Sequence, residues 1–426
     1  MTKKCAPYGL LGRTLGHSWS PKIHTMLGSV PYELFEREPE DVENFIRHGS
    51  WQGINVTIPY KLDAARLADA RTSRVERMGA ANTLVRRADG TILADNTDVL
   101  GFSWMLGRFC QRELGQAAST LLSGKEALVL GSGGASKAVV AALKDAGARP
   151  AVISRKGPDT YENLLERHAE AVLVVNATPV GMFPNCPASP LDDSTLGKLA
   201  QRSLKGVLDV VYNPTRTGLC LAAERQGLPF ASGLSMLVAQ AFFSSELFQD
   251  KELDQSLVET IESAIAAESA NVILIGMPGS GKTSTGKRLA RLMGRPFVDI
   301  DDAIAAKMGS SAADIIMAQG EDAFRAIETD ITGSYAAQSG LVIACGGGVV
   351  TRPENYPLLH QNGTIVMLDR PLDELSPAGR PLSAKRGIET LAKERMGAYR
   401  SWADFVLPTT GSSMGDAKAI LSLING

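Results

Sequence analysis

The sequence NVILIGMPGSGKT at residues 271–283 places a glycine-rich turn directly after a short apolar run. The turn matches the pattern G-x-x-x-x-G-K-[ST], and a helical pattern with Leu289 and Leu292 follows it. Glycines in such a turn allow backbone N–H groups to surround phosphate oxygens. The stretch predicts a P-loop that binds ATP, in which Lys282 reaches the β- and γ-phosphates and Thr283 holds Mg²⁺. The predicted ATP-binding residues are Gly279, Ser280, Gly281, Lys282, Thr283 and Ser284.

A second glycine-rich turn, LVLGSGGASKA at residues 128–138, lies between a predicted strand and a predicted helix. It is a variant of the dinucleotide-binding fingerprint, in which the pyrophosphate lies at the helix N-terminus. NAD sites usually carry an acidic residue at the end of the next strand, but this strand ends in Ile153-Ser-Arg-Lys156. Two cations favour the 2′-phosphate of NADP(H). The predicted cofactor-binding residues here are Gly131, Ser132, Gly133, Gly134, Ala135, Ser154, Arg155 and Lys156.

Short apolar runs alternate with helical patterns along the whole chain, which predicts an α/β fold with parallel sheets. An Asp89-Gly90 turn predicts one hairpin, between residues 82–87 and 91–94. Residues 248–270 are helix-prone and predict one terminal helix that also serves as a junction. The other predicted strands are Tyr8–Leu11, Gly53–Ile58, Ala127–Leu130, Ala151–Ile153, Ala171–Val175 and Val207–Val211.

Composition excludes several classes of protein. The 426 residues carry a net charge of −2, so no basic field is present to hold nucleic acid or a membrane surface. The five cysteines are scattered without metal-type spacing, which argues against a zinc site or a disulfide framework. No apolar run approaches the roughly 20 residues of a membrane helix, and no signal peptide is evident. We therefore expect a cytoplasmic enzyme that acts on small molecules.

Three motifs follow the P-loop. Val298-Asp-Ile-Asp301 carries two carboxylates that are expected on one side of a strand. Arg325 and Glu328, in GEDAFRAIE at residues 320–328, share a helical face. Cys345-Gly-Gly-Gly348 follows an apolar strand and allows a ligand to approach the backbone closely. With the P-loop, these motifs in this order resemble shikimate kinase, over residues 271–426, and imply a fold of the nucleoside-monophosphate-kinase type.

The kinase resemblance implies individual roles. Asp299 would organise the Mg²⁺ shell together with Thr283, and Asp301 would hold the reacting hydroxyl and take its proton. Lys282 and Asp301 would be the catalytic residues. Paired arginines would clamp the substrate carboxylate, a task suited to guanidinium groups. The implied substrate-binding residues are Asp301, Arg325, Gly347, Gly348 and Arg395.

Arg380, in Gly379-Arg-Pro-Leu382, matches the lid arginine of that family, which reaches the ATP phosphates. The segment before it is shorter than the usual lid lead-in and lacks its further arginines. A second hypothesis is therefore that one half of the chain is a ligand-binding or regulatory module attached to one working enzyme.

Seven motifs in the first part of the chain, in this order, resemble shikimate dehydrogenase. The resemblance covers nearly all residues before 249. The motifs are GHSWSP at 16–21, GINVTIPYK at 53–61, GAANT at 79–83, DNTD at 95–98, NATPVGM at 176–182, DVVYNP at 209–214 and MLVAQA at 236–241.

The dehydrogenase resemblance also implies roles. Ketone reduction needs a hydride from NADPH and a proton donor at the oxygen. Lys61 and Asp98 match the catalytic pair, in which Lys61 transfers the proton and Asp98 positions Lys61 and binds a substrate hydroxyl. Thr178 and Met182 would complete the cofactor site. The implied substrate-binding residues are Ser18, Ser20, Thr57, Asn82, Asp98, Tyr212 and Gln240.

These expectations define four segments: a substrate-binding domain at 1–100, an NADP-binding Rossmann-type domain at 101–248 whose last helix returns to the first domain, a helical junction at 249–270 and a kinase domain at 271–426. The expected reactions are reduction of 3-dehydroshikimate to shikimate and phosphorylation of shikimate to shikimate 3-phosphate. A third hypothesis keeps both activities and broadens the substrate, for example to quinate. The sequence leaves the oligomeric state open.

Overall fold

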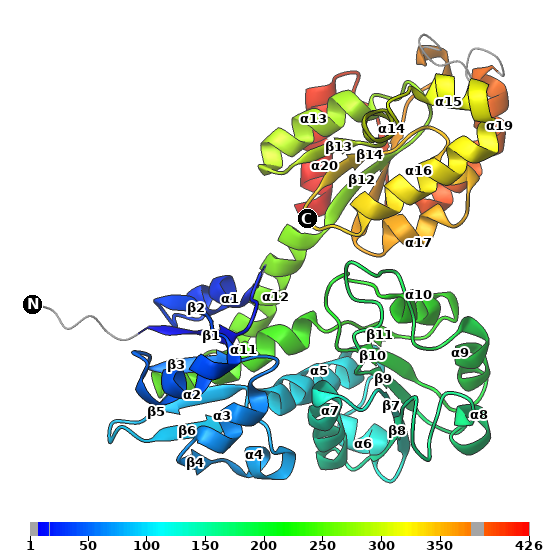
Figure 1. Cartoon of the computed structure of the whole chain (residues 1–426). Coiled ribbons are helices and arrows are strands. Elements are labelled where there is room, and N and C mark those ends of the chain that lie inside the picture. The colour runs from blue at the N-terminus through cyan, green and yellow to red at the C-terminus, as the bar shows by residue number, and fades with distance from the viewer. Residues whose placement is uncertain (1–6, 17, 376–386, 426) are drawn as a thin grey trace, which may run out of the picture. The chain divides into compact units, whose positions relative to one another are not determined.

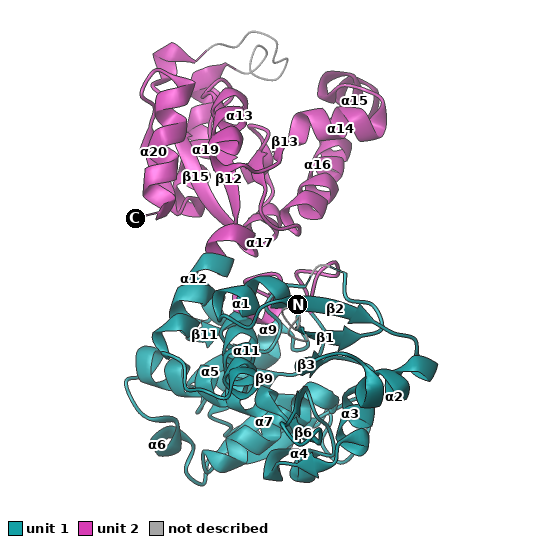
Figure 2. Cartoon of the chain, turned by 90° about the vertical axis from the view of Figure 1, so that its left-hand side faces the viewer, with its two compact units in different colours: residues 1–180, 189–212, 222–265 teal, residues 181–188, 213–221, 266–426 magenta. Residues whose placement is uncertain are grey.

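The computed structural model describes residues 7–16, 18–375 and 387–425 (Figure 1). The chain forms two compact units (Figure 2). Unit 1 comprises residues 1–180, 189–212 and 222–265, and unit 2 comprises residues 181–188, 213–221 and 266–426. Among the described residues, no helix is both long and apolar enough to cross a membrane. Both units are α/β, as the alternation of apolar runs and helical patterns predicted.

The first lobe of unit 1 is built on a six-stranded sheet of order β2-β1-β3-β5-β6-β4. Strands β2, β1 and β3 are parallel, whereas the hairpin β5–β6 is antiparallel and pairs antiparallel with β3. The sheet is therefore mixed and not purely parallel, because the tight turn at Asp89-Gly90 reverses the chain. Its strands are β1 (Tyr8–Gly12), β2 (Tyr32–Glu36), β3 (Gly53–Val56), β4 (Ala70–Arg71), β5 (Thr83–Arg86) and β6 (Ile92–Asp95). Its helices are α1 (Ser20–Met26), α2 (Pro39–His48), α3 (Lys61–Leu67) and α4 (Ser73–Met78).

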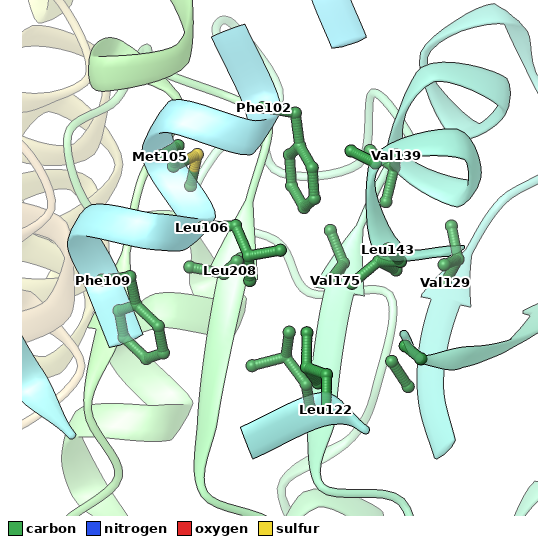
Figure 3. Close-up of a cluster of buried hydrophobic side chains, with 14 of the residues drawn as sticks. Phe102, Met105, Leu106, Phe109, Leu122, Val129, Val139, Leu143, Val175 and Leu208 are labelled. Atoms are coloured by element: carbon green, nitrogen blue, oxygen red, sulfur yellow. The ribbon is translucent and has the colours of Figure 1, made fainter. Parts of the chain in front are cut away.

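The second lobe has a parallel five-stranded sheet of order β11-β10-β9-β7-β8. Helix α5 lays Phe102, Met105, Leu106 and Phe109 against the sheet (Figure 3). These aromatic and aliphatic side chains are almost fully buried, so they supply much of the hydrophobic stabilisation of the lobe. The strands are β7 (Glu126–Leu130), β8 (Arg149–Ile153), β9 (Leu173–Asn176), β10 (Gly206–Asp209) and β11 (Phe230–Ala231). The helices are α5 (Thr97–Glu113), α6 (Ala118–Leu122), α7 (Gly134–Asp145), α8 (Leu164–Arg167), α9 (Asp193–Ala200) and α10 (Gly218–Arg225).

Helix α11 (Leu234–Gln249) packs along α5, and the approach is close at Gly101. A Cβ atom at Gly101 would lie 2.7 Å from the carbonyl oxygen of Met236, so a larger residue would force the helices apart. The single helix predicted over residues 248–270 is wrong. Helix α11 ends at Gln249, where Asp250 turns the chain with φ +47°, and α12 (Ser256–Ser269) starts separately.

Unit 2 contains a parallel sheet of order β13-β14-β12-β15-β16 with apolar clusters on both faces. The ends of β12 and β14 are neighbours, and ligands of open α/β sheets bind at such carboxyl ends. The strands are β12 (Asn271–Ile275), β13 (Phe297–Asp299), β14 (Val342–Ala344), β15 (Gly363–Asp369) and β16 (Phe405–Pro408). The helices are α13 (Lys282–Met293), α14 (Ile300–Met308), α15 (Ala312–Gln319), α16 (Glu321–Ala336), α17 (Asn355–His360), α19 (Ile388–Trp402) and α20 (Ser413–Asn425). The described part of unit 2 also contains the 3-10 turns Val349–Thr351 and Leu372–Glu374.

Candidate active sites

Lys61 and Asp98 form an ion pair in unit 1, although 37 residues separate them along the chain. Lys61 Nζ lies 2.7 Å from Asp98 Oδ2, because Lys61 begins α3 and Asp98 lies in the first turn of α5. The two side chains keep 27% and 16% of their surface exposed. The pair is therefore partly shielded from water, but a small molecule can still reach it.

Asn82 connects this pair to the rest of the lobe. Its Nδ2 donates to Asp98 Oδ1 at 2.9 Å, and its Oδ1 accepts from the backbone N–H of Thr97 at 2.7 Å. Gln240, on α11, places its Oε1 3.4 Å from the same Nδ2. Three predicted substrate-binding residues, Asn82, Asp98 and Gln240, thus lie together, and the amide of Asn82 holds the carboxylate of Asp98 in one orientation.

A buried cluster of hydroxyl groups lies behind Asn82, and sequence reasoning did not identify its centre. Ser244 Oγ lies within 2.9 Å of Asn55 Nδ2 and of the hydroxyls of Thr83 and Thr97. Ser244 is four residues after Gln240, so it shares a face of α11 with that residue. This spacing is the signal that could have identified it. The cluster anchors β3, the β5–β6 hairpin and α5 to one helix.

Ser18 and Ser20 are half-buried at the start of α1. The two side chains would point the same way only if this segment were extended, and it is not. Trp19 between them has helical angles, and the backbone N–H of Ser20 donates to Ser18 Oγ at 3.2 Å.

The hydroxyl of Tyr32 donates to Asn55 Oδ1 at 2.9 Å, and burial raises the pKa of Tyr32 well above its usual range. Tyr32 therefore remains a neutral hydrogen-bond donor.

Thr57 is half-buried just after β3, and its backbone N–H donates to the carbonyl oxygen of Leu11. Tyr212 is half-buried after β10, and burial raises the pKa of its hydroxyl. Among the described residues, no side-chain hydrogen bond joins Thr57 or Tyr212 to the Lys61–Asp98 pair. Met182 is exposed and belongs to unit 2.

The dinucleotide turn lies between β7 and α7 and fits a pyrophosphate. Gly131 has φ +101°, and a Cβ atom there would lie 2.6 Å from Thr178 Cγ2, so only glycine fits. Ser132, Gly133 and Gly134 are exposed, and no atom lies within 4 Å of a Cβ atom built on either glycine. Helix α7 begins at Gly134, so its N-terminal N–H groups face this open space.

Two further predicted cofactor regions follow the carboxyl ends of β8 and β9. Arg155 and Lys156 lie shortly after the end of β8, and both are exposed. Thr178 donates from its N–H and its hydroxyl to Asn176 Oδ1, at 2.9 and 2.7 Å. Asn176 in turn donates from Nδ2 to both carboxylate oxygens of the buried Asp209, at 3.0 Å. Asn176 and Asp209 thus fix the loop that carries Thr178, a role that sequence reasoning did not assign.

The P-loop of unit 2 lies between β12 and α13. Gly276, Gly279 and Gly281 all have positive φ angles, which side chains other than glycine rarely adopt. Lys282 Nζ is buried and donates to the carbonyl oxygens of Gly276 and Met277 at 2.9 and 3.0 Å. The loop thereby holds a cation at the N-terminus of α13, which suits a polyphosphate.

An oxygen-rich pair lies next to the P-loop. Thr283 is exposed, and its hydroxyl donates to Asp299 Oδ2 at 2.7 Å. A hydroxyl and a carboxylate are the hard oxygen ligands that Mg²⁺ prefers. These residues therefore fit a magnesium ion at the phosphates.

Asp301 follows Asp299, but the two do not alternate along a strand as we expected. Strand β13 ends at Asp299, whose carboxylate caps α14 by accepting from the N–H of Asp301 at 3.0 Å. Helical geometry then directs Asp301 toward Gly346 and Glu328. A Cβ atom at Gly346 would lie 2.9 Å from Asp301 Oδ1 and 2.6 Å from Glu328 Oε1. Removal of its carboxyl group from water and the charge of Asp299 raise the pKa of Asp301.

Arg325 is buried and paired with two carboxylates of its own helix. It donates to Glu328 Oε2 at 2.6 Å and to Glu321 Oε1 at 3.2 Å. Arg395, on α19, donates to the carbonyl oxygen of Gly347 at 2.7 Å, and the hydroxyl of Tyr399 donates to the same oxygen. Tyr399 was not among the predicted residues. Arg380 lies outside the residues that the structure describes.

The two sites define two classes of enzyme. Unit 1 combines an NADP-type dinucleotide turn with a lysine–carboxylate pair, which defines a nicotinamide-dependent oxidoreductase. Unit 2 combines a P-loop with acidic and guanidinium groups, which defines a small-molecule kinase. The chain belongs to the shikimate dehydrogenase family, and it also carries a shikimate kinase domain.

Family models match two segments: the shikimate dehydrogenase substrate binding domain at residues 10–84 and shikimate kinase at residues 278–425. The shikimate dehydrogenase (NADP(+)) of Clostridium beijerinckii is 31% identical over 282 residues, which cover 61% of this chain and 98% of the relative. The structure of shikimate 5-dehydrogenase from Thermus thermophilus with NADP(H) and shikimate is 29% identical, with a TM-score of 0.51 over 61% of this chain and 98% of that one. The quinate dehydrogenase of Corynebacterium glutamicum with NAD is 28% identical, with a TM-score of 0.51 over 60% and 98% of the two chains. The chain is therefore an enzyme of the shikimate pathway, with a shikimate dehydrogenase (NADP(+)) part and a shikimate kinase part.

Proposed function

We propose that the dehydrogenase part reduces 3-dehydroshikimate to shikimate, and that the kinase domain phosphorylates shikimate to shikimate 3-phosphate. The observation that carries the first reaction is the Lys61–Asp98 ion pair, with Nζ and Oδ2 2.7 Å apart and Asn82 bonded to the other carboxylate oxygen. The second reaction is supported by the P-loop beside Asp299, Asp301 and Arg325. The product of the first reaction carries the hydroxyl that the second one needs.

In the first reaction, NADPH supplies the hydride. Lys61 donates a proton from Nζ to the carbonyl oxygen as it becomes a hydroxyl, and removes it in the reverse direction. Asp98 keeps Nζ in place and accepts a hydrogen bond from a substrate hydroxyl. The substrate carboxylate binds Ser18 and Ser20. Ring hydroxyls bind Thr57, Asn82, Tyr212 and Gln240, which the dehydrogenase resemblance assigns to this task.

Binding of NADP(H) involves three parts of the second lobe. The pyrophosphate lies at the turn Gly131–Ala135, on the N-terminus of α7. Arg155 and Lys156 neutralise the 2′-phosphate, beside Ser154. Thr178 contacts the nicotinamide end. The basic strand end is the feature that favours NADP(H) over NAD(H), which usually needs an acidic residue there.

In the second reaction, ATP supplies the γ-phosphoryl group. The residues Gly279–Ser284 bind its phosphates, and Lys282 moves from its carbonyl partners to the β- and γ-phosphates. Thr283 and Asp299 hold Mg²⁺. Asp301 orients the substrate hydroxyl and accepts its proton. Arg325 and Arg395 bind the substrate carboxylate, and Gly347 and Gly348 contact the ring hydroxyls. Arg380 is assigned to the phosphates on the resemblance alone.

The experiment follows NADPH consumption by the full chain with 3-dehydroshikimate, with and without ATP and Mg²⁺, and measures ADP. We expect ADP only when 3-dehydroshikimate and NADPH are both present, or when shikimate is added directly. Absence of ADP with added shikimate would leave the kinase domain as a binding module. Phosphorylation removes shikimate, so ATP is also expected to increase the total NADPH consumed at equilibrium.

Quinate is the second candidate substrate, because the quinate dehydrogenase of Corynebacterium glutamicum shares the fold at 28% identity. Oxidation assays with NADP⁺ or NAD⁺ and either shikimate or quinate distinguish the two. We expect shikimate with NADP⁺ to give the highest kcat/KM. A higher value for quinate with NAD⁺ would contradict the proposed substrate.

Gly348→Ala is expected to raise the KM for shikimate in the kinase reaction by about 10–100-fold. This is the effect expected when one charge-assisted hydrogen bond to the substrate is lost. A Cβ atom there would lie 2.0 Å from Arg325 Nη1, so the guanidinium must move. The matched control is Gly397→Ala on α19, where no atom lies within 4 Å of the new Cβ atom. Steady-state kinetics with ADP detection measures the effect, and an unchanged KM in Gly348→Ala would argue against Arg325 as a carboxylate ligand.

A further inference from the structure

The loop after β8, which carries Arg155 and Lys156, is held by a cluster of ionisable side chains. Asp159 Oδ1 lies 2.7 Å from an Nη1 of Arg167 and 3.0 Å from Nε2 of His168. The other ring nitrogen of His168 lies 3.1 Å from Oε1 of Glu126, the first residue of β7. His168 is buried, so the loop is connected through Asp159 to the core of the lobe.

Backbone bonds close the same loop. Ser154 N–H donates to the carbonyl oxygen of Asp159 at 3.1 Å, and Ser154 and Thr160 form a parallel β-bridge. Asn163 Nδ2 and the guanidinium of Arg167 both donate to the carbonyl oxygen of Pro158. Residues 155–158 therefore form a short closed loop whose two ends meet.

The tip of the loop is exposed, whereas the side chains at its base are paired with one another. Arg155, Lys156 and Gly157 are exposed, and among the described residues neither cation forms an ion pair with a carboxylate. Asp159 is the acid nearest in sequence, but it is directed to Arg167 and His168. The cluster thus keeps a carboxylate away from two cations that would otherwise pair with it, and holds the loop in one conformation.

We propose that Asp159 is a specificity-determining positioning residue that sets the preference for NADPH over NADH. Held by Arg167 and His168, it presents Arg155 and Lys156 to the 2′-phosphate in a preformed arrangement, so that less conformational entropy is lost when the cofactor binds. Asp159 itself does not touch the cofactor. This inference rests on the proposed NADP(H) site.

The direction in which Asp159→Asn changes NADPH binding distinguishes a positioning role from a simple effect of charge. If Asp159 acted only as a nearby negative charge, Asp159→Asn would remove repulsion and improve NADPH binding. If it positions the loop, the same change weakens NADPH binding. We expect the KM for NADPH to rise about five- to tenfold, as for loss of order in one or two side chains. The KM for NADH and the kcat with either cofactor are expected to stay within about twofold, since only NADPH carries the 2′-phosphate.

Two variants complete the test. Asp193→Asn breaks the exposed ion pair with Arg225, at 2.8 Å in the same unit, and is expected to leave both KM values unchanged. Asp159→Glu keeps the charge and is expected to recover part of the NADPH preference. Thermal unfolding of each variant shows whether it is folded.

The outcomes separate this inference from the proposed function. If the unmodified chain shows no preference for NADPH, the proposed NADP(H) site itself fails. If it prefers NADPH, but Asp159→Asn leaves that preference unchanged or strengthens it, only the positioning role is overturned.

Discussion

Lys61→Met is expected to lower kcat of the dehydrogenase reaction by about 10²–10⁴-fold, the usual contribution of a positioned proton donor. Methionine preserves most of the apolar stem of Lys61 but cannot donate a proton to the carbonyl oxygen. Asp98 loses its contact with Nζ at 2.7 Å but keeps the hydrogen bond from Asn82. The substrate-binding groups therefore remain in place, and the KM for 3-dehydroshikimate is expected to change far less than kcat.

The kinase reaction of the same molecules is an internal control, because Lys61 belongs to unit 1 and the P-loop to unit 2. Lys144→Met, on the exposed last turn of α7, is the matched control for loss of one positive charge. Rates are measured by NADPH absorbance. If Lys61→Met retains more than about a tenth of kcat, the loss is smaller than removal of a proton donor usually causes. That result would assign the proton transfer to another group.

Asp301→Asn is expected to lower the rate of shikimate phosphorylation by about 10²–10⁴-fold, as for removal of a general base. The amide has nearly the shape of the carboxylate, so Gly346 and Glu328 are not displaced. It cannot accept the proton of the substrate hydroxyl. ATP binding is expected to persist, since Lys282 and Thr283 are untouched, and it can be measured by calorimetry on the same variant.

Acid pH is expected to act on the same carboxylate. Removal of the carboxyl group from water and the charge of Asp299 raise the pKa of Asp301, so it is protonated at a higher pH than an ordinary aspartate. As pH falls through that raised pKa, the base is lost and kcat/KM for shikimate decreases. Asp302→Asn, at the exposed neighbouring residue, is the matched control and is expected to keep most of the rate. A pH profile with an acid limb at the ordinary aspartate pKa would contradict the role of Asp301.

Motifs that depend on local backbone geometry were predicted accurately from the sequence. The turns at Gly131 and Gly281 both have positive φ angles, and each lies between a strand and a helix as expected. Such turns are determined by a few consecutive residues, because only glycine tolerates these angles at little cost. The basic strand end at Arg155 and Lys156 is also local, and both residues lie shortly after β8, where the sequence placed them.

The errors occurred where a pattern could be satisfied in two ways. Residues 248–270 have one apolar spacing, but Val258, Ile261 and Ile265 pack with Phe242 of α11 in the same cluster. Two helices that pack against one core have the same spacing of apolar residues. The break between them at Asp250 is therefore not visible in that spacing. The D-x-D motif likewise fits alternation along a strand, but Asp299 ends the strand and caps a helix.

The sequence by itself determined the α/β class, the two nucleotide-binding turns and, through the ordered motifs, the two enzyme families. These features reside in short stretches whose chemistry is set by neighbouring residues. Only the tertiary structure decided which distant side chains meet: Lys61 with Asp98, Ser244 with residues of two strands and a helix, and Asp159 with His168. The physical reason is that such contacts depend on how whole elements pack, and packing is a collective result of many buried side chains that no single motif encodes.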